Sequence, residues 1–233
     1  MTTGWNYRVG QSRPQPSAAP EPQVARLFET PVIVDTLPDA PAINVQLKEI
    51  ILAQREREPG VLISNEGGGW HSRTDMLSWG GEPAATLLER VIRSADKFTA
   101  DIRSQGAPRF RWHPEMWANV SGNGAYNSMH AHPGSFHSAV YYVEDGYAGS
   151  SGPELGGELV LLDPRMPGVA MNSPDLRFTV PGGEPAHWEA KMRPAAGRIV
   201  MFPSWLNHSV RPYLGDGLRI SIAINLTAVP VNS

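Results

Sequence analysis

The sequence predicts an α+β protein in which helices precede an antiparallel β-sandwich or barrel, and two observations support this prediction. Segments 40–58 and 82–106 space their apolar residues at helical intervals. After residue 107, short β-prone segments follow one another with Gly, Pro or Asn turns between them. Two helices followed by such a region are typical of a single α+β domain.

The composition is typical of an ordinary soluble protein with one sizeable core. The chain has 233 residues, of which 41% are hydrophobic and 18% are charged. Its formal net charge of −3 gives no electrostatic footprint for nucleic acid or an anionic membrane. The absence of cysteine excludes disulfides, thiolate metal sites and cysteine nucleophiles, which leaves His, Asp and Glu as the strong metal ligands.

Residues 1–25 are rich in Pro, Ser, Gln and Gly, and we expect a flexible arm ahead of a single domain at 26–233. Alternatively, Trp5 and Tyr7 dock on the domain or on a partner. The arm lacks the apolar core of a secretory signal, and no apolar run approaches the roughly 18 residues of a membrane span. We therefore expect a cytoplasmic protein.

The helical region is expected over about 40–106. A short strand at 30–37 precedes the first helix. The second helix begins with Pro83 in its first turn and ends at Gly106. The segment between the two helices is expected to be a loop. The apolar stripe of the second helix comprises Leu88, Val91, Ala95, Phe98 and Ile102.

The β-rich region, about 107–228, contains seven or eight expected strands. An insert at 164–194, rich in Pro and Gly, is expected to form a pair of short strands, or to cover the active site and select the substrate. The main expected strands lie at 116–120, 136–144, 157–163, 176–180, 198–203, 208–214 and 218–229.

Three of the seven histidines lie close together just ahead of a predicted strand, at positions 130, 132 and 137. Ligands two residues apart on an extended segment point to the same side, because side-chain direction alternates. His130 and His132 meet this rule, and barrel closure can add a distant third ligand, for which His208 is the candidate. Such a facial set holds non-haem Fe(II) and leaves three positions open, although it usually includes one carboxylate.

A candidate anchor for an anionic co-substrate follows His208 in the sequence. Arg219 begins a strongly apolar strand, where a guanidinium is costly to bury unless it meets an anion. Ser221 lies two residues further along and faces the same way. Because the planar fork of arginine matches a carboxylate bidentately, this pair predicts a carboxylate-binding site.

These residues belong to an ordered set of motifs, H-x-H, YY, GGEL, G-x-I-V-x-F-P, H and R-x-S. The set resembles the Fe(II)/2-oxoglutarate-dependent oxygenase superfamily, close to its prolyl-hydroxylase-like branch. The stretches "SNEGGGWHS", "SAVYYVEDG" and "GGELVLLDPR" further resemble a group of mostly uncharacterised bacterial and phage members. The resemblance covers about residues 30–228. It implies a double-stranded β-helix, a jelly-roll or cupin-like barrel, with N-terminal helices at its flank and iron bound at one mouth.

The resemblance also implies roles for individual residues. His130 matches the first ligand of the family's His-x-Asp/Glu motif, and His208 matches the distal histidine. Arg219 and Ser221 match the pair that grips the distal carboxylate of 2-oxoglutarate, and Tyr142 matches a tyrosine that often hydrogen-bonds the same carboxylate. The positions at which members commonly line the co-substrate or substrate pocket are occupied by Asn119 and Asn127.

One departure from the family pattern is that His132 stands at the carboxylate position. Three neutral ligands leave an Fe(II) site one unit more positive, which favours a dianionic co-substrate and alters the redox poise. Alternatively, His137 completes the site if Pro133 and Gly134 bend the chain. The remaining histidines are expected to be structural or at the surface, although the glycines before His71 would permit a lid.

The implied function is oxidation of an unactivated C–H bond with Fe(II), 2-oxoglutarate and O2, by default a hydroxylation, with 2-oxoglutarate converted to succinate and CO2. Desaturation, cyclisation and epoxidation share the early steps. One alternative is a cupin-like metal-binding protein or isomerase without 2-oxoglutarate turnover, which leaves Arg219 unexplained. Another is an interaction protein that retains a dead site.

The expected substrate is a small molecule, such as an amino acid or natural-product intermediate, because the modest charge does not favour nucleic acid. Arg193, Arg198 and Arg211 are candidates to anchor a substrate carboxylate. The oligomeric state stays open.

Overall fold

The computed structural model describes residues 28–168, 173, 175–180 and 182–231. The chain divides into two compact units, Met1–Thr30 and Pro31–Ser233. Every helix and strand assigned within the described ranges lies in the second unit. The expected arm at 1–25, including Trp5 and Tyr7, lies outside the described residues.

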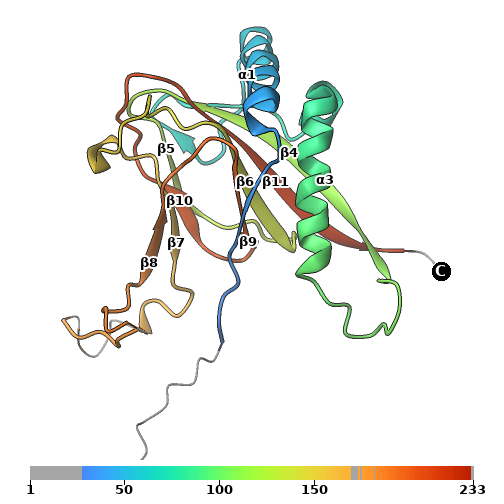
Figure 1. Cartoon of the computed structure of the whole chain (residues 1–233), viewed down its shortest axis with the longest axis vertical. Coiled ribbons are helices and arrows are strands. Elements are labelled where there is room, and N and C mark those ends of the chain that lie inside the picture. Colours follow the sequence, from blue (N-terminus) through green and yellow to red (C-terminus); the bar gives the residue numbers. More distant parts are fainter. Residues whose placement is uncertain (1–27, 169–172, 174, 181, 232–233) are drawn as a thin grey trace, which may run out of the picture. The chain divides into compact units, whose positions relative to one another are not determined.

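Two antiparallel sheets form the frame of the second unit, as the strands in Figure 1 show. The larger sheet has the strand order β1-β9-β6-β11-β4-β3, and the smaller sheet has the order β2-β5-β10-β7-β8. Neighbours in these orders are distant in the sequence, which is the arrangement of a jelly roll. The larger sheet comprises β1 (Ile33–Thr36), β3 (Trp70–His71), β4 (Phe110–Ser121), β6 (His137–Glu144), β9 (Arg198–Pro203) and β11 (Arg219–Pro230). The smaller sheet comprises β2 (Asn65–Glu66), β5 (Tyr126–His130), β7 (Leu159–Leu162), β8 (Glu189–Met192) and β10 (His208–Val210).

The main hydrophobic core lies between the helices and the outer face of the larger sheet. The helices are α1 (Ala40–Arg57), α2 (Met76–Trp79) and α3 (Gly81–Lys97), with a short 3-10 helix at Pro153–Leu155. Figure 1 shows α1 and α3 side by side near β4 and β11. Leu87 and Val91 of α3 are buried in this core, and each contributes about 1.5–3 kcal/mol by the usual value for an apolar side chain. The even-numbered residues of the central strands, such as Ile222 and Ala118, face the helices.

The second helix is shorter than the sequence predicts. It ends at Lys97, and Phe98 and Ile102, placed in its apolar stripe, are 52% and 95% exposed. Asp101 terminates the helical path, because its carboxylate accepts the backbone N–H groups of Arg103 and Arg109 and so closes a turn. The prediction that the helix runs to Gly106 is therefore wrong.

The strand predictions hold for the central strands and fail in the insert. The segment 176–180 makes a single bridge, between Thr179 and Pro185, instead of a strand. The insert instead ends in β8, which pairs with β7. The sequence also did not indicate β5, whose residues are partly exposed on both faces and so lack an apolar alternation. The loop expected between the helices contains β2, β3 and α2.

Within the described ranges, no helix combines the length and apolarity that crossing a membrane requires.

Candidate active site

Side chains of the larger sheet form one wall of a cavity of about 390 Å³, and they lie in rows across neighbouring strands. Arg219, Ser221, Ala223 and Asn225 of β11 face this cavity, and the last three are each flanked by partners on β4 and β6. Ser221 lies between Asn119 and Tyr142. Two pairs further along, Asn225 lies between Glu115 and Ser138. The opposite wall includes residues of the smaller sheet.

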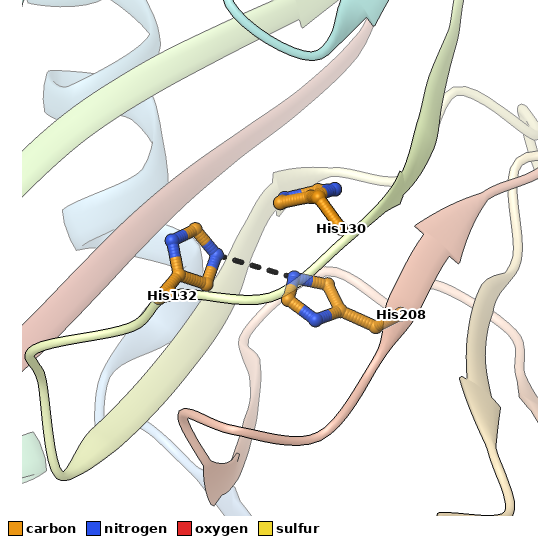
Figure 2. Close-up of side chains that lie close together, drawn as sticks. All are labelled: His130, His132 and His208. Carbon is orange, nitrogen blue, oxygen red and sulfur yellow. Dashed lines mark hydrogen bonds between the residues drawn. The ribbon is translucent and has the colours of Figure 1, made fainter.

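Three imidazoles converge from the smaller sheet and the turn that follows it, as Figure 2 shows. His130 ends β5 and pairs with His208 at the start of β10, while His132 lies just beyond β5. The Nε2 atoms of His132 and His208 are 3.2 Å apart. One ligand atom from each ring lies within 4.8 Å of the others, so the three rings could hold a single metal ion.

Backbone carbonyls fix which nitrogen two of these rings present. His130 Nδ1 lies 2.7 Å from the Ser128 carbonyl, and His208 Nδ1 lies 2.9 Å from the Leu206 carbonyl. A carbonyl oxygen only accepts, so each Nδ1 carries the proton and each Nε2 keeps a lone pair. This is the arrangement in which histidine binds a metal through Nε2.

An amide performs the same task for His132. Asn225 Nδ2 lies 3.2 Å from His132 Nδ1, and Asn225 Oδ1 accepts from Ser138 Oγ at 2.8 Å. With the amide rotated by half a turn, Asn225 accepts from His132 Nδ1–H and donates to the serine, which leaves Nε2 of His132 free for a metal. Asn225 was not predicted from the sequence, although it shares the inward face of β11 with Arg219 and Ser221.

Burial keeps the imidazoles of His132 and His208 in the neutral, metal-binding form. Burial, together with nearby His130, lowers the pKa of His132 from 6.5 to about 4. Burial also lowers the pKa of His208 to about 3, although its hydrogen bond to the Leu206 carbonyl favours the protonated ring. Neither ring therefore needs to lose a proton to bind a metal near neutral pH.

His137, the alternative third ligand, lies on the other face of β6. Its Nε2 is 2.7 Å from Thr99 Oγ1, and its ring packs against Trp112 and Phe136. The side chain is buried on that face and does not line the cavity. The structure therefore brings together His130, His132 and His208 and leaves His137 outside the group.

The far end of the cavity contains an unpaired buried cation. Arg219 is 1% exposed, and no carboxylate of the described residues lies within 4.0 Å of it. Its Nη1 is 3.4 Å from Ser221 Oγ, its Nε has no hydrogen-bond partner, and its guanidinium lies 5.2 Å from the ring centre of Tyr142. Burial raises the pKa of Tyr142, so its hydroxyl, which also has no partner, stays a donor. Unpaired buried donors of this kind fit a carboxylate.

The other predicted residues are distributed less simply. Asn119 lines the cavity with its Oδ1 unpaired, while Asn127 lines it with Nδ2 bonded to Ser64 Oγ at 3.2 Å. His71, expected to be structural or part of a lid, is buried in the cavity wall and stacks on Trp117 at 5.6 Å. It enters the wall because β3 adds to the edge of β4 opposite Asn119, a pairing that no local sequence pattern indicates.

The three arginines proposed to anchor a substrate carboxylate lie elsewhere. Arg193 stacks over the Tyr147 ring at 3.8 Å, and Arg198 donates to the Arg193 carbonyl. Arg211 pairs with Glu158 at 3.8 Å. None of the three lines the cavity, so this expectation is not met by the structure.

Comparisons with known proteins agree with this geometry. A sequence profile of the family described as "Putative 2OG-Fe(II) oxygenase" matches residues 115–225. The prolyl hydroxylase of Trichoplax adhaerens, in complex with a hypoxia inducible factor peptide, has a TM-score of 0.57 at 13% identity over 84% of this chain and 83% of that one. HygX from Streptomyces hygroscopicus, with nickel and 2-oxoglutarate bound, has a TM-score of 0.55 at 12% identity over 85% and 83%. The α-ketoglutarate-dependent epimerase SnoN from nogalamycin biosynthesis has a TM-score of 0.57 at 15% identity over 87% and 79%. No curated protein matches the chain.

The two sheets show the fold of a double-stranded β-helix, and the three converging imidazoles in its cavity are of the kind that could hold a metal ion. Residues 115–225 match the profile of the putative 2OG-Fe(II) oxygenases, and the fold resembles solved enzymes of the Fe(II)/2-oxoglutarate-dependent oxygenase superfamily, whose members use Fe(II), 2-oxoglutarate and O2. The predictions of this superfamily and of its fold are confirmed.

Replacing Asn225 by alanine is expected to weaken Fe(II) binding about 10- to 100-fold, because His132 loses the group that orients its ring. Titration of the protein with Fe(II) under nitrogen measures this change. Thr227→Ala, two residues further along the same strand and outside the cavity lining, is the matched control and should keep the wild-type affinity. Equal affinities in all three proteins would contradict the orienting role.

The metal-free chain is expected to lose stability as the pH falls from about 7 to about 5. Its buried histidines stay neutral in this window, because burial lowers the pKa of His132 to about 4 and of His208 to about 3. In the unfolded chain the same histidines take up protons near pH 6.5, so the unfolded state binds more protons than the folded state. Lowering the pH therefore favours the unfolded state and reduces the free energy of unfolding. Urea unfolding at several pH values measures the slope. His208→Gln should make it shallower, and a flat profile in the wild type would rule this explanation out.

Proposed function

We propose that this chain, through a single domain at 26–233, hydroxylates an unactivated C–H bond of a small molecule. In this proposal His130, His132 and His208 hold Fe(II). Arg219, Ser221 and Tyr142 bind the distal carboxylate of 2-oxoglutarate, and Asn119 and Asn127 line the same cavity. The overall reaction is substrate C–H plus 2-oxoglutarate plus O2 to C–OH plus succinate plus CO2.

The observation that supports this proposal most strongly is the pairing of two features in one cavity. One ring nitrogen from each of three imidazoles lies within 4.8 Å of the other two, and a buried guanidinium without a carboxylate partner among the described residues lines the same cavity. A metal-binding module without a co-substrate would need only the first feature. A dicarboxylic acid that reaches the metal would use both, because the guanidinium compensates one of its charges.

The chain's own residues bind and orient the reactants and exclude water from them. When bound, Fe(II) with 2-oxoglutarate supplies the oxidising chemistry, and the protein contributes geometry and anchoring. Tyr142 of β6 and Ser221 of β11 are cross-strand partners, so both hydroxyls can donate to the carboxylate that Arg219 binds. Asn225 holds His132 in the orientation that a metal needs.

A small molecule is favoured by the size of the cavity. At about 390 Å³ it lies in the range of pockets that enclose small ligands, and part of it must hold 2-oxoglutarate. HygX has also been solved with hygromycin B bound. SnoN is an epimerase, so the same chemistry on a related fold need not end in hydroxylation.

The test is succinate formation from 2-oxoglutarate by the purified protein with Fe(II), O2 and ascorbate, coupled to separate titrations of Fe(II) and 2-oxoglutarate. The proposal expects both to bind and succinate to form, slowly without the prime substrate. A cupin-like protein or an isomerase would bind the metal without consuming 2-oxoglutarate. A protein with a dead site would do neither, and either result would overturn the proposal.

A further inference from the structure

The outer end of the cavity contains a carboxylate that the proposed chemistry does not use. Glu115 of β4 faces the cavity beside Asn225, the residue that orients His132. Its side chain makes no ion pair or hydrogen bond with any described residue. Glu115 is not part of the group of possible metal ligands, which contains only the three histidines among the described residues.

The formal charges of the cavity wall lie at its two ends. Arg219 and Glu115 are the only Lys, Arg, Asp or Glu side chains among the residues that line it. Along β11, Arg219 and the cross-strand neighbour of Glu115 are six residues apart, which is roughly 20 Å of strand. If the 2-oxoglutarate dianion binds both Fe(II) and Arg219, it offsets the charge of the metal, and a substrate entering beside the three histidines meets one charged side chain, that of Glu115.

His71 adds a second acceptor to the same region. Its Nδ1 lies 2.5 Å from the Ser72 carbonyl, so Nδ1 carries the proton and Nε2 keeps a lone pair. No described group bonds to Nε2, and the ring is held in the cavity wall by its stack on Trp117. Trp117 and Glu115 lie two residues apart on the same face of β4, so the two acceptors share one wall.

We propose that the outer end of the cavity is a subsite for a protonated amine. Glu115 forms an ion pair with the ammonium group, and His71 Nε2 accepts a hydrogen bond from a second N–H or O–H of the same molecule. The substrate is thus a small amine rather than a carboxylic acid, an inference that rests on the proposed function because it assigns Arg219 to 2-oxoglutarate. The apolar side chain of Ile63, which is 65% exposed at the same cavity, can contact the hydrocarbon part of such a molecule.

The test compares three probes of similar shape and different charge: phenethylamine, N-acetylphenethylamine and 3-phenylpropionate. Each is titrated calorimetrically, under nitrogen, into the full chain loaded with Fe(II) and 2-oxoglutarate. We expect the affinity for phenethylamine to be about ten-fold or more above that for the other two probes, because only phenethylamine can form an ion pair with the carboxylate. Glu115→Gln should remove this preference, and Glu115→Lys should reverse it in favour of 3-phenylpropionate.

The control is Glu66→Gln on β2, which removes the same charge from an exposed position outside the cavity lining and should keep the preference. His71→Phe should weaken phenethylamine binding less than Glu115→Gln does. His71→Gln retains a hydrogen-bond acceptor and should weaken this binding least of the three. Equal binding of the three probes, no binding of phenethylamine, or equal effects of the Glu66 and Glu115 variants would overturn the amine subsite while iron and 2-oxoglutarate still bind. Failure of 2-oxoglutarate itself to bind the wild type would instead overturn the proposed function.

Discussion

Replacing Arg219 by methionine is expected to weaken 2-oxoglutarate binding strongly and, at the same time, to make the ligand-free chain more stable. The guanidinium is 1% exposed and has no carboxylate partner among the described residues, so the ligand-free fold bears the cost of an uncompensated buried cation. Methionine fills similar space without that cost, and such replacements stabilise by about 1–4 kcal/mol. Loss of a buried, charge-assisted contact weakens binding by about 2–5 kcal/mol, which is about 30-fold or more.

Two measurements on one variant therefore move in opposite directions. Calorimetric titration with 2-oxoglutarate gives the affinity, and urea unfolding of the ligand-free protein gives the stability. Arg198→Met is the control, because Arg198 is half-buried outside the cavity lining and donates to the Arg193 carbonyl. It should keep 2-oxoglutarate binding and gain no stability. An Arg219→Met protein that binds 2-oxoglutarate as the wild type does would show that the guanidinium has another purpose.

Those parts of the site that depend on local geometry could be predicted from the sequence. The spacing of His130 and His132 and that of Arg219 and Ser221 use only the alternation of side chains along an extended chain. The apolar strand around Arg219 also made the burial of a cation foreseeable. Both pairs face the cavity in the structure.

The parts that depend on pairing between strands could not be predicted. Asn225 orients His132 because β11 brings it beside Ser138 of β6, and no single segment contains that register. His71 enters the wall only because β3 adds to the edge of β4. The early end of α3 has a similar cause, since Asp101 finds its backbone partners up to eight residues away.

His132 gives the second large effect, because it stands where the superfamily usually has a carboxylate. His132→Ala is expected to weaken Fe(II) binding about 100-fold or more, since it removes one of the three proposed ligands and the partner of Asn225. His132→Asp restores a ligand and lowers the charge of the iron centre by one unit. This variant should keep Fe(II) affinity within about ten-fold of the wild type. Its affinity for 2-oxoglutarate should fall, because the less positive iron centre attracts the dianion less.

The competing assignment gives opposite results. If His137 were the third ligand, His137→Phe would remove iron binding and His132→Ala would not. The buried bond of His137 to Thr99 on the far face of β6 instead leads us to expect that His137→Phe lowers stability and leaves the Fe(II) titration unchanged. His113→Ala, at an exposed histidine outside the cavity lining, controls for the loss of an imidazole alone. His132→Asp changes the charge of the site but keeps the number of ligands. Loss of Fe(II) binding in His132→Ala together with its retention in His132→Asp would therefore identify residue 132 as a ligand and not as a neighbour of one.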